Sequence, residues 1–283
     1  MIDHPLVESI AVPLAIATLL TGLLWRFNRP RWAGAAVVAA LLVASLMILD
    51  GWHWPALTGL HKLAWLFAAT LALQLIAPIG TTRGTRVAWA IVALAILVCG
   101  LIWIGWPRLS HDPLSAAVTL GALLPALLIA LMLLTQPSAE MTPVATSGVV
   151  AALGLAGVAF FAGSLALMQL ALATAAAVGG FALWNWPRPR FAFNPEFAWL
   201  LVTCLGLLVA LVIWLTPVSR WALAPLLLIA ALPMLVARLP LPARWPRAVL
   251  APLLIAVLAA PLAGLAVWLA LPGESAEPDL YYH

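Results

Sequence analysis

Long apolar runs, each about twenty residues, follow one another along almost the whole chain and constrain its fold more than any other feature. A helix of about 20 apolar residues can cross the hydrocarbon core of a bilayer, because it rises about 1.5 Å per residue through about 30 Å. Of the 283 residues, 66% are hydrophobic and 8% are charged, whereas a soluble domain carries about 25% charged residues to face water. The sequence therefore predicts an all-α, polytopic transmembrane bundle whose main solvent is lipid.

Charged residues and Pro/Gly clusters divide the chain into ten predicted spans, at 9–25, 32–49, 63–80, 87–106, 114–134, 144–162, 165–184, 197–216, 221–237 and 248–271. The segment 141–187 is ambiguous, because it contains no charged residue. It is too long for one span, so we expect two helices joined by a tight turn near Phe160–Ser164 rather than one helix plus a re-entrant segment. Residues 1–271 then form a single membrane domain, followed by a short acidic tail at 272–283.

Basic residues support ten spans with both termini on the outer, non-cytoplasmic side. Short cytoplasmic loops carry an excess of Lys and Arg. With ten spans, three cations fall outside (Lys62, Arg108 and Arg220) and ten fall inside: Arg26, Arg29, Arg31, Arg83, Arg86, Arg188, Arg190, Arg238, Arg244 and Arg247. A single span over 141–187 would reverse the sides of all later loops and remove the excess of cations inside. We therefore expect a multi-pass protein of a bacterial plasma (inner) membrane.

Ionisable side chains are missing from the predicted spans except near their ends. Such residues at membrane depth usually mark proton relays or ion paths, so a transporter driven by a buried carboxylate is disfavoured. Among the polar groups that remain, Gln74 and Gln169 have the greatest need of hydrogen-bond partners. Each can clamp two helices, with about 0.6–2 kcal/mol of stabilisation, or line a solute path. We favour the clamp.

Small residues and prolines predict how some of the helices pack and where they are interrupted. Glycine and alanine are dense in 144–162 and 165–184, which allows helix backbones to approach closely. We therefore expect these two helices at the centre of the bundle. The last two predicted helices are interrupted by prolines, namely Pro225 and Pro233, then Pro252 and Pro261. Interrupted helices can form a solute site, although simple kinks are the more common outcome.

The densest polar island in the first half of the chain is DGWHWPALTGLHK, residues 50–62. We interpret it as a loop at the headgroup level between the second and third helices. A metal site can nevertheless be drawn from the imidazoles and carboxylates predicted on this side, namely Asp50, His53, His61, His111 and Asp112. These groups suit zinc or copper. Because Lys62 beside His61 repels a cation and no H-x-x-x-H spacing presets the geometry, we expect neither a bound metal nor another cofactor.

Function is less constrained than fold. No G-x-S-x-G, H-E-x-x-H or Walker sequence is present, so an enzymatic role is disfavoured. The net charge of +4 is scattered between apolar runs and forms no basic stripe for nucleic acid, so the expected partners are the lipid bilayer and other membrane proteins. The favoured function is a permease or exporter for a small neutral or amphipathic solute. The alternative is a non-catalytic membrane subunit or assembly factor of a larger membrane complex.

Overall fold

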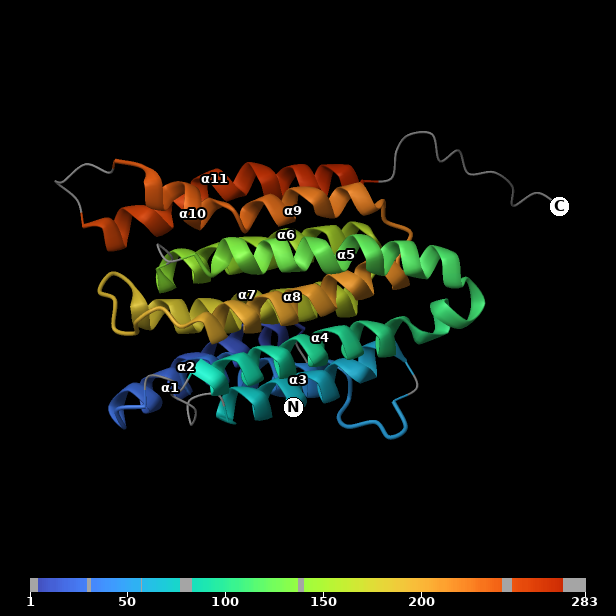
Figure 1. The fold of residues 1–283 in the computed structure, drawn as a ribbon, viewed down its shortest axis with the longest axis horizontal. Helices are drawn as coiled ribbons and strands as arrows, with labels where there is room; N and C mark the ends of the chain where they lie inside the picture. The colour runs from blue at the N-terminus through green and yellow to red at the C-terminus, as the bar shows by residue number, and fades with distance from the viewer. Residues whose placement is uncertain are drawn as a thin grey trace.

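The structure, a computed structural model, describes residues 5–29, 32–56, 58–76, 83–136, 140–240 and 246–271. These residues form helices and their connections without any strand, so the predicted all-α class is confirmed. In chain order the helices are the π-helical turn η1 (Val7–Ala11), α1 (Val12–Arg26), α2 (Ala33–Ile48), α3 (Gly59–Ile76), α4 (Arg83–His111), α5 (Pro113–Leu134), α6 (Met141–Phe161), α7 (Leu165–Asn185), α8 (Pro195–Leu215), the 3-10 turn η4 (Arg220–Leu223), α9 (Ala224–Ile229), α10 (Leu232–Arg238) and α11 (Arg247–Ala270). Figure 1 shows them side by side in an elongated bundle.

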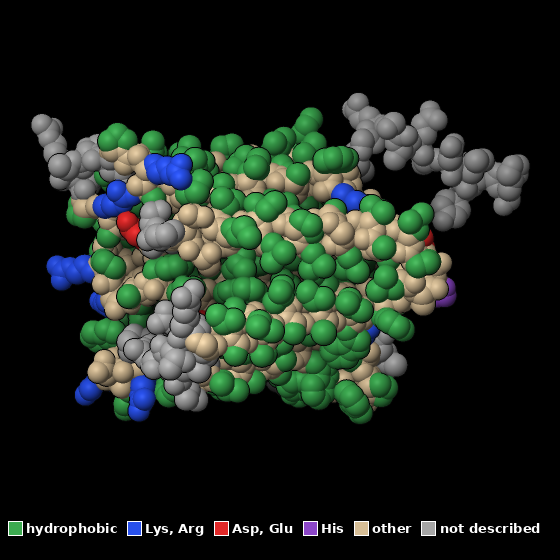
Figure 2. All heavy atoms as spheres, in the orientation of Figure 1, with side chains coloured by type: hydrophobic (Ala, Val, Ile, Leu, Met, Phe, Trp, Pro, Cys, Tyr) green, Lys and Arg blue, Asp and Glu red, His purple; other side chains and the backbone are tan. Residues whose placement is uncertain are grey.

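Nine helical segments in the described part of the chain are long and apolar enough to cross a membrane, and α2 is apolar but shorter. Large hydrophobic side chains such as Leu19, Ile129 and Trp268 are exposed along the outside, at a density that is unusual for a water-soluble protein. On the face drawn in Figure 2, hydrophobic side chains cover the helices, whereas Lys and Arg gather mainly at one end. The chain is therefore a multi-spanning helical membrane protein.

The uncharged segment 141–187 forms two helices, as predicted, with α6 ending at Phe161 and α7 beginning at Leu165. Between them Gly163 has a φ of +79°, a left-handed conformation that glycine adopts without steric cost. The Ser164 N–H donates to the Ala159 carbonyl at 3.0 Å, which satisfies one of the carbonyls left free at the end of α6. The chain reverses within three residues, and α6 and α7 pack against each other.

The third helix begins earlier than predicted, since α3 starts at Gly59 and not at 63, whereas the predicted end at 80 lies outside the described residues. Thr58 accounts for the early start, because its Oγ1 accepts a hydrogen bond from the His61 N–H at 3.3 Å and threonine is a favourable N-cap. His61 and Lys62 therefore lie in the first turn of a helix and not in a loop.

Prolines have different effects in different helices. The predicted ninth span is divided into η4, α9 and α10, with Pro225 and Pro233 in the first turns of α9 and α10. Proline favours this position, because its missing N–H is not needed there. By contrast, α11 continues as one helix through Pro252 and Pro261, so the last helix is not broken at either proline. Helix α4 likewise continues through Pro107 and ends five residues beyond the predicted 106.

Helices α6 and α7 lie at the centre of the bundle, which confirms the expectation from their small residues. Helix α7 packs against α1, α2, α6 and α8, and α6 packs against α7, α8, α9 and α11. Glycine permits these close approaches. A Cβ at Gly157 would lie 2.5 Å from Val267 of α11, and one at Gly180 would lie 2.7 Å from the Leu14 carbonyl oxygen of α1. The helices are held by this steric fit, as expected in lipid.

The two ends of the bundle differ in charge. Among the described residues, helix ends and connections at one end, called here the Arg-rich end, carry Arg26, Arg29, Arg188, Arg190, Arg238 and Arg247. The opposite end carries Lys62, Arg108 and Arg220. The α7–α8 connection lies at the Arg-rich end and the α4–α5 turn at the opposite end, at the left and right of Figure 1. Arg31, Arg244 and the acidic tail 272–283 lie outside the described residues.

Cysteine labelling tests which end faces the cytoplasm. In a variant without the native Cys99 and Cys204, we expect Pro189→Cys to react only from the cytoplasmic side, because loops rich in arginine are retained there. Ser110→Cys and Pro217→Cys should react only from outside. The measurement is labelling of intact cells and of inverted vesicles with a membrane-impermeant maleimide. Reaction of position 189 in intact cells would reject this orientation.

Candidate functional site

The polar island at 50–62 combines the connection after α2 with the first turn of α3, and it brings two of the predicted histidines together. The rings of His53 and His61 stack with their centroids 4.0 Å apart. The His53 Nδ1 lies 3.2 Å from the Gly51 carbonyl oxygen, and the Trp65 Nε1–H donates to the His53 carbonyl at 3.3 Å. The His61 Nδ1 is buried and has no hydrogen-bond partner among the described residues. The loop is thus packed onto the first turns of α3.

The other three candidate metal ligands have separate positions. Asp50 follows α2 with a φ of +56°, and His111 is the last residue of α4. The Asp112 Oδ1 accepts a hydrogen bond from the Ser115 N–H at 3.2 Å, as the N-cap of α5. Within the described residues, no three His, Cys, Asp or Glu side chains converge to hold a metal ion. The stacked histidine pair supplies two imidazoles, whereas zinc sites use three or four protein ligands.

Lys62 is buried beside this pair, with 7% of its surface exposed. Its Nζ donates to the Trp103 carbonyl at 2.7 Å and lies 5.5 Å from the centroid of the Trp103 ring. Its side chain forms no ion pair with a carboxylate of the described residues. The hydrogen bond and the cation–π contact offset part of the cost of burying the ammonium group. Lys62 therefore joins the start of α3 to α4 at Trp103. Its charge disfavours a cation at the neighbouring imidazoles.

The two glutamines differ. Gln74 is buried, and its Nε2 donates to the Glu196 carbonyl at 3.1 Å, which links α3 to the first turn of α8. Its Oε1 lies against Gly34 of α2, where an added Cβ would be 3.0 Å away. Gln169 is half-buried on α7 and makes no hydrogen bond to another described residue through its side chain. Gln74 has the contacts of a helix clamp, and neither side chain lines the cavity described next.

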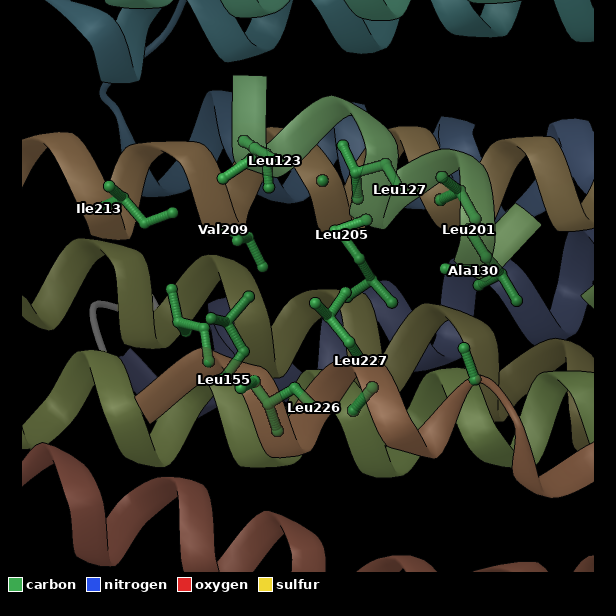
Figure 3. Close-up of a pocket in the computed structure, with 18 of the residues that line it drawn as sticks. Leu123, Leu127, Ala130, Leu155, Leu201, Leu205, Val209, Ile213, Leu226 and Leu227 are labelled. Atoms are coloured by element: carbon green, nitrogen blue, oxygen red, sulfur yellow. The ribbon is translucent and has the colours of Figure 1, made fainter. Parts of the chain in front are cut away.

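A cavity of about 510 Å³ lies between α5, α6, α8 and the η4–α9 segment, and is called here the groove. Its walls are largely leucine and valine, with Leu123 and Leu127 from α5, Leu155 from α6, Leu205 and Val209 from α8, and Leu226 from α9. In Figure 3 these side chains reach from the two sides into a common space. The sequence did not point to this site, because residues that line a groove are as apolar as residues that pack or face lipid.

Small residues create the space. On α5 the lining includes Ala122, Ala126 and Ala130, and a spacing of four places them on one face of a helix. Across the groove, α6 contributes Gly148 and Ala151. Because alanine and glycine leave room that leucine would fill, the helices enclose an open volume where these faces meet. The alanine spacing on α5 is the sequence signal that could have indicated the groove.

Polar groups in the groove wall are few. Thr119 Oγ1 donates to the Ser115 carbonyl and Ser147 Oγ to the Val144 carbonyl, each at 2.8 Å, so both hydroxyl donors are used within their own helices. Arg220 is the charged residue of the lining. The wall therefore offers a hydrocarbon surface along its length and a guanidinium group at one place.

Arg220 lies at one end of the groove. Its Nη2 is 3.5 Å from Ser115 Oγ in the first turn of α5. The lining continues along α5 to Leu134, the last residue of that helix, so the groove runs from the opposite end of the bundle toward the Arg-rich end. Lining residues that are exposed belong to α5 and to η4–α9, among them Ala122 and Ala224. The groove is therefore open between these two elements.

Comparison with known proteins does not assign a family. No protein-family model matches the chain, and no curated protein matches it in sequence. The geometry and chemistry of the groove therefore carry the functional inference.

Proposed function

We propose that this protein is a permease that moves an amphipathic, mainly apolar solute across the membrane, and that the solute binds in the groove. The observation that carries the proposal is an open volume of about 510 Å³ with hydrocarbon walls. Small-molecule sites commonly enclose about 300–1,000 Å³ and are lined by apolar side chains with a few polar groups. Burial of apolar solute surface is non-directional, so such a wall suits the apolar part of many solutes.

The opening between α5 and η4–α9 supports entry from the bilayer. Val118 on α5 and Leu228 on α9 are exposed next to it, as expected of surfaces that face lipid. A solute that dissolves in lipid can then reach the groove sideways, without passing through water. The wall needs no ordered hydrogen-bond partners for this step, since its hydroxyl donors already bond to their own helices.

The interrupted ninth span supports movement of the groove wall. Helices α9 and α10 are separated at 230–231, next to the lining residue Ala230. Pro233 cannot donate a hydrogen bond across this break, so the two short helices are less firmly joined than turns of one helix. Discontinuous helices at a substrate site are a recurrent feature of membrane transporters.

Coupling to an ion gradient through a buried carboxylate is not part of this proposal. Among the described residues, no Asp or Glu is buried, and such carboxylates are the usual proton carriers inside membranes. We therefore infer movement down the solute's own gradient.

We also propose that the protein lies in a bacterial inner membrane with the Arg-rich end in the cytoplasm, following the bias of basic residues.

The test is to fill the groove. Ala126→Trp places a large ring in the open volume, and we expect it to slow solute movement by about tenfold or more, since an added 1.4 kcal/mol gives a factor of ten. The measurement is transbilayer movement of NBD-labelled lysophospholipids in proteoliposomes, followed by dithionite quenching. Lysophosphatidylglycerol and lysophosphatidylcholine are both used as probes.

Ile129→Trp is the matched control. Ile129 lies on the same helix and is 57% exposed, outside the groove lining, so a ring there should point into lipid and leave movement unchanged. If protein-containing vesicles move neither probe faster than empty vesicles, or if the two variants behave alike, the permease proposal is rejected.

A further inference from the structure

The charged end of the groove carries information about the solute. The Arg220 side chain is exposed, and its one hydrogen bond to a described residue is the long contact of 3.5 Å with Ser115 Oγ. No carboxylate of the described residues lies within 4.0 Å of the Arg220 side chain. The ion pair in the described part of the chain joins Arg247 and Glu140, near the Arg-rich end. A guanidinium group has five N–H donors. Most of those on Arg220 therefore remain free to bind a ligand.

The surroundings of Arg220 suit an anionic group at the membrane surface. Trp221, the next residue, also lines the groove and is 78% exposed, as is typical of rings at the headgroup level. The Ser115 hydroxyl supplies a further donor beside the guanidinium. The nearest carboxylate in sequence to Ser115 is Asp112, whose Oδ1 is engaged with the Ser115 N–H. Phosphate oxygens match the planar fork of arginine, which can bind them through two parallel hydrogen bonds.

The length of the groove suits one acyl chain. Its lining runs from Thr119 to Leu134 on α5, a helical rise of about 22 Å. One leaflet of a bilayer contributes about 15 Å to a hydrocarbon core of about 30 Å, so a single extended lipid chain fits within the groove.

We propose that the occupant is a single-chain phospholipid with a net negative headgroup, with its acyl chain in the groove and its phosphate at Arg220. This inference rests on the groove being the substrate site of the permease proposed above. It narrows the solute from amphipathic molecules in general to anionic lysophospholipids. Single-chain lipids with a neutral headgroup lack a charge for the guanidinium to bind.

The test measures binding in phosphatidylcholine nanodiscs and does not depend on movement. The probes are lysophosphatidylglycerol and lysophosphatidylcholine, each with a nitroxide on the acyl chain, and the readout is the motionally restricted fraction in the electron paramagnetic resonance spectrum. We expect the anionic probe to bind wild-type protein about fivefold more tightly, the size expected for about one favourable cation near a membrane surface.

Variants separate the headgroup from the chain. Arg220→Gln should remove the preference, and Arg220→Lys should retain most of it, since the charge stays in place. Arg188→Gln is the matched control, because Arg188 is exposed at the Arg-rich end, and this variant should leave binding unchanged. Ala126→Trp should reduce binding of both probes, because it obstructs the chain.

Equal binding of the two probes to wild-type protein would overturn the inference, as would equal effects of Arg220→Gln and Arg188→Gln or normal binding to Ala126→Trp. Selective binding without any transbilayer movement would reject the permease proposal and keep the assigned occupant. Movement of both probes without a headgroup preference would reject the occupant and keep the permease.

Discussion

Gly180→Leu is expected to destabilise the folded protein by about 3 kcal/mol or more, at the upper end of the cost of overpacking a core. An added Cβ at Gly180 would lie 2.7 Å from the Leu14 carbonyl oxygen and 2.8 Å from Thr18 Oγ1. The first of these atoms is backbone, so it can move away only if α1 moves. A leucine would therefore separate α1 from α7 at the centre of the bundle.

The neighbouring glycine gives a matched control. A Cβ at Gly179 would meet nothing within 4 Å, so Gly179→Leu should have a much smaller effect. The measurement is thermal unfolding in detergent, where the Gly180 variant should lose about 6–12 °C in Tm, given about 2–4 °C per kcal/mol for a chain of this size class. Equal shifts for the two variants would show that α1 and α7 do not approach each other as described.

Asn185→Ala is expected to lower the free energy of unfolding by about 2–4 kcal/mol, because it leaves two backbone donors without an acceptor. The Asn185 side chain is fully buried at the end of α7, and its Oδ1 accepts from the Arg190 N–H at 2.7 Å and the Phe191 N–H at 2.8 Å. Phe191 is itself buried, so water does not readily replace the lost acceptor. This asparagine thus holds the α7–α8 connection against the helix end.

Trypsin sensitivity and Tm together test this role. The connection carries Arg188 and Arg190, so its release in Asn185→Ala should speed cleavage there and lower the Tm. Asn194→Ala is the control, since Asn194 Oδ1 accepts one N–H, that of Glu196 at 3.1 Å, as the N-cap of α8. Loss of such a cap costs about 1 kcal/mol. A smaller loss of stability in the Asn185 variant than in the Asn194 variant would contradict the structure.

Helix existence followed from local sequence properties. The length and apolarity of a run decide whether it can span a membrane, because each backbone N–H and C=O must bond within the segment. That rule was sufficient even for 141–187, where the turn at Gly163 needed a residue that accepts a positive φ. It was less reliable at helix ends. Thr58 capped α3 four residues early, and Pro107 did not end α4.

The candidate sites depended on which elements become neighbours, which local rules do not determine. The predicted topology placed five candidate ligands on one side of the bundle. In the folded protein only His53 and His61 of these five come together, with ring centroids 4.0 Å apart. Lys62 was expected in an exposed loop, and the start of α3 buried it against Trp103 of α4. The same is true of the groove, in which the consecutive helices α5 and α6 meet α8 and η4–α9 from a later part of the chain.

The sequence by itself determined that this protein is a bundle of lipid-facing helices with arginine gathered at alternate connections, because hydrophobic transfer and the need to satisfy backbone hydrogen bonds act on each segment separately. Only the tertiary structure decided which helix faces meet. In lipid no hydrophobic force selects among apolar faces, so helix pairing is decided by steric fit. Glycine at position 180 lets α1 and α7 touch, whereas alanines at 122, 126 and 130 leave an open volume between α5, α6 and α9. The groove is the space that remains between them, and Arg220 lies at one end of it.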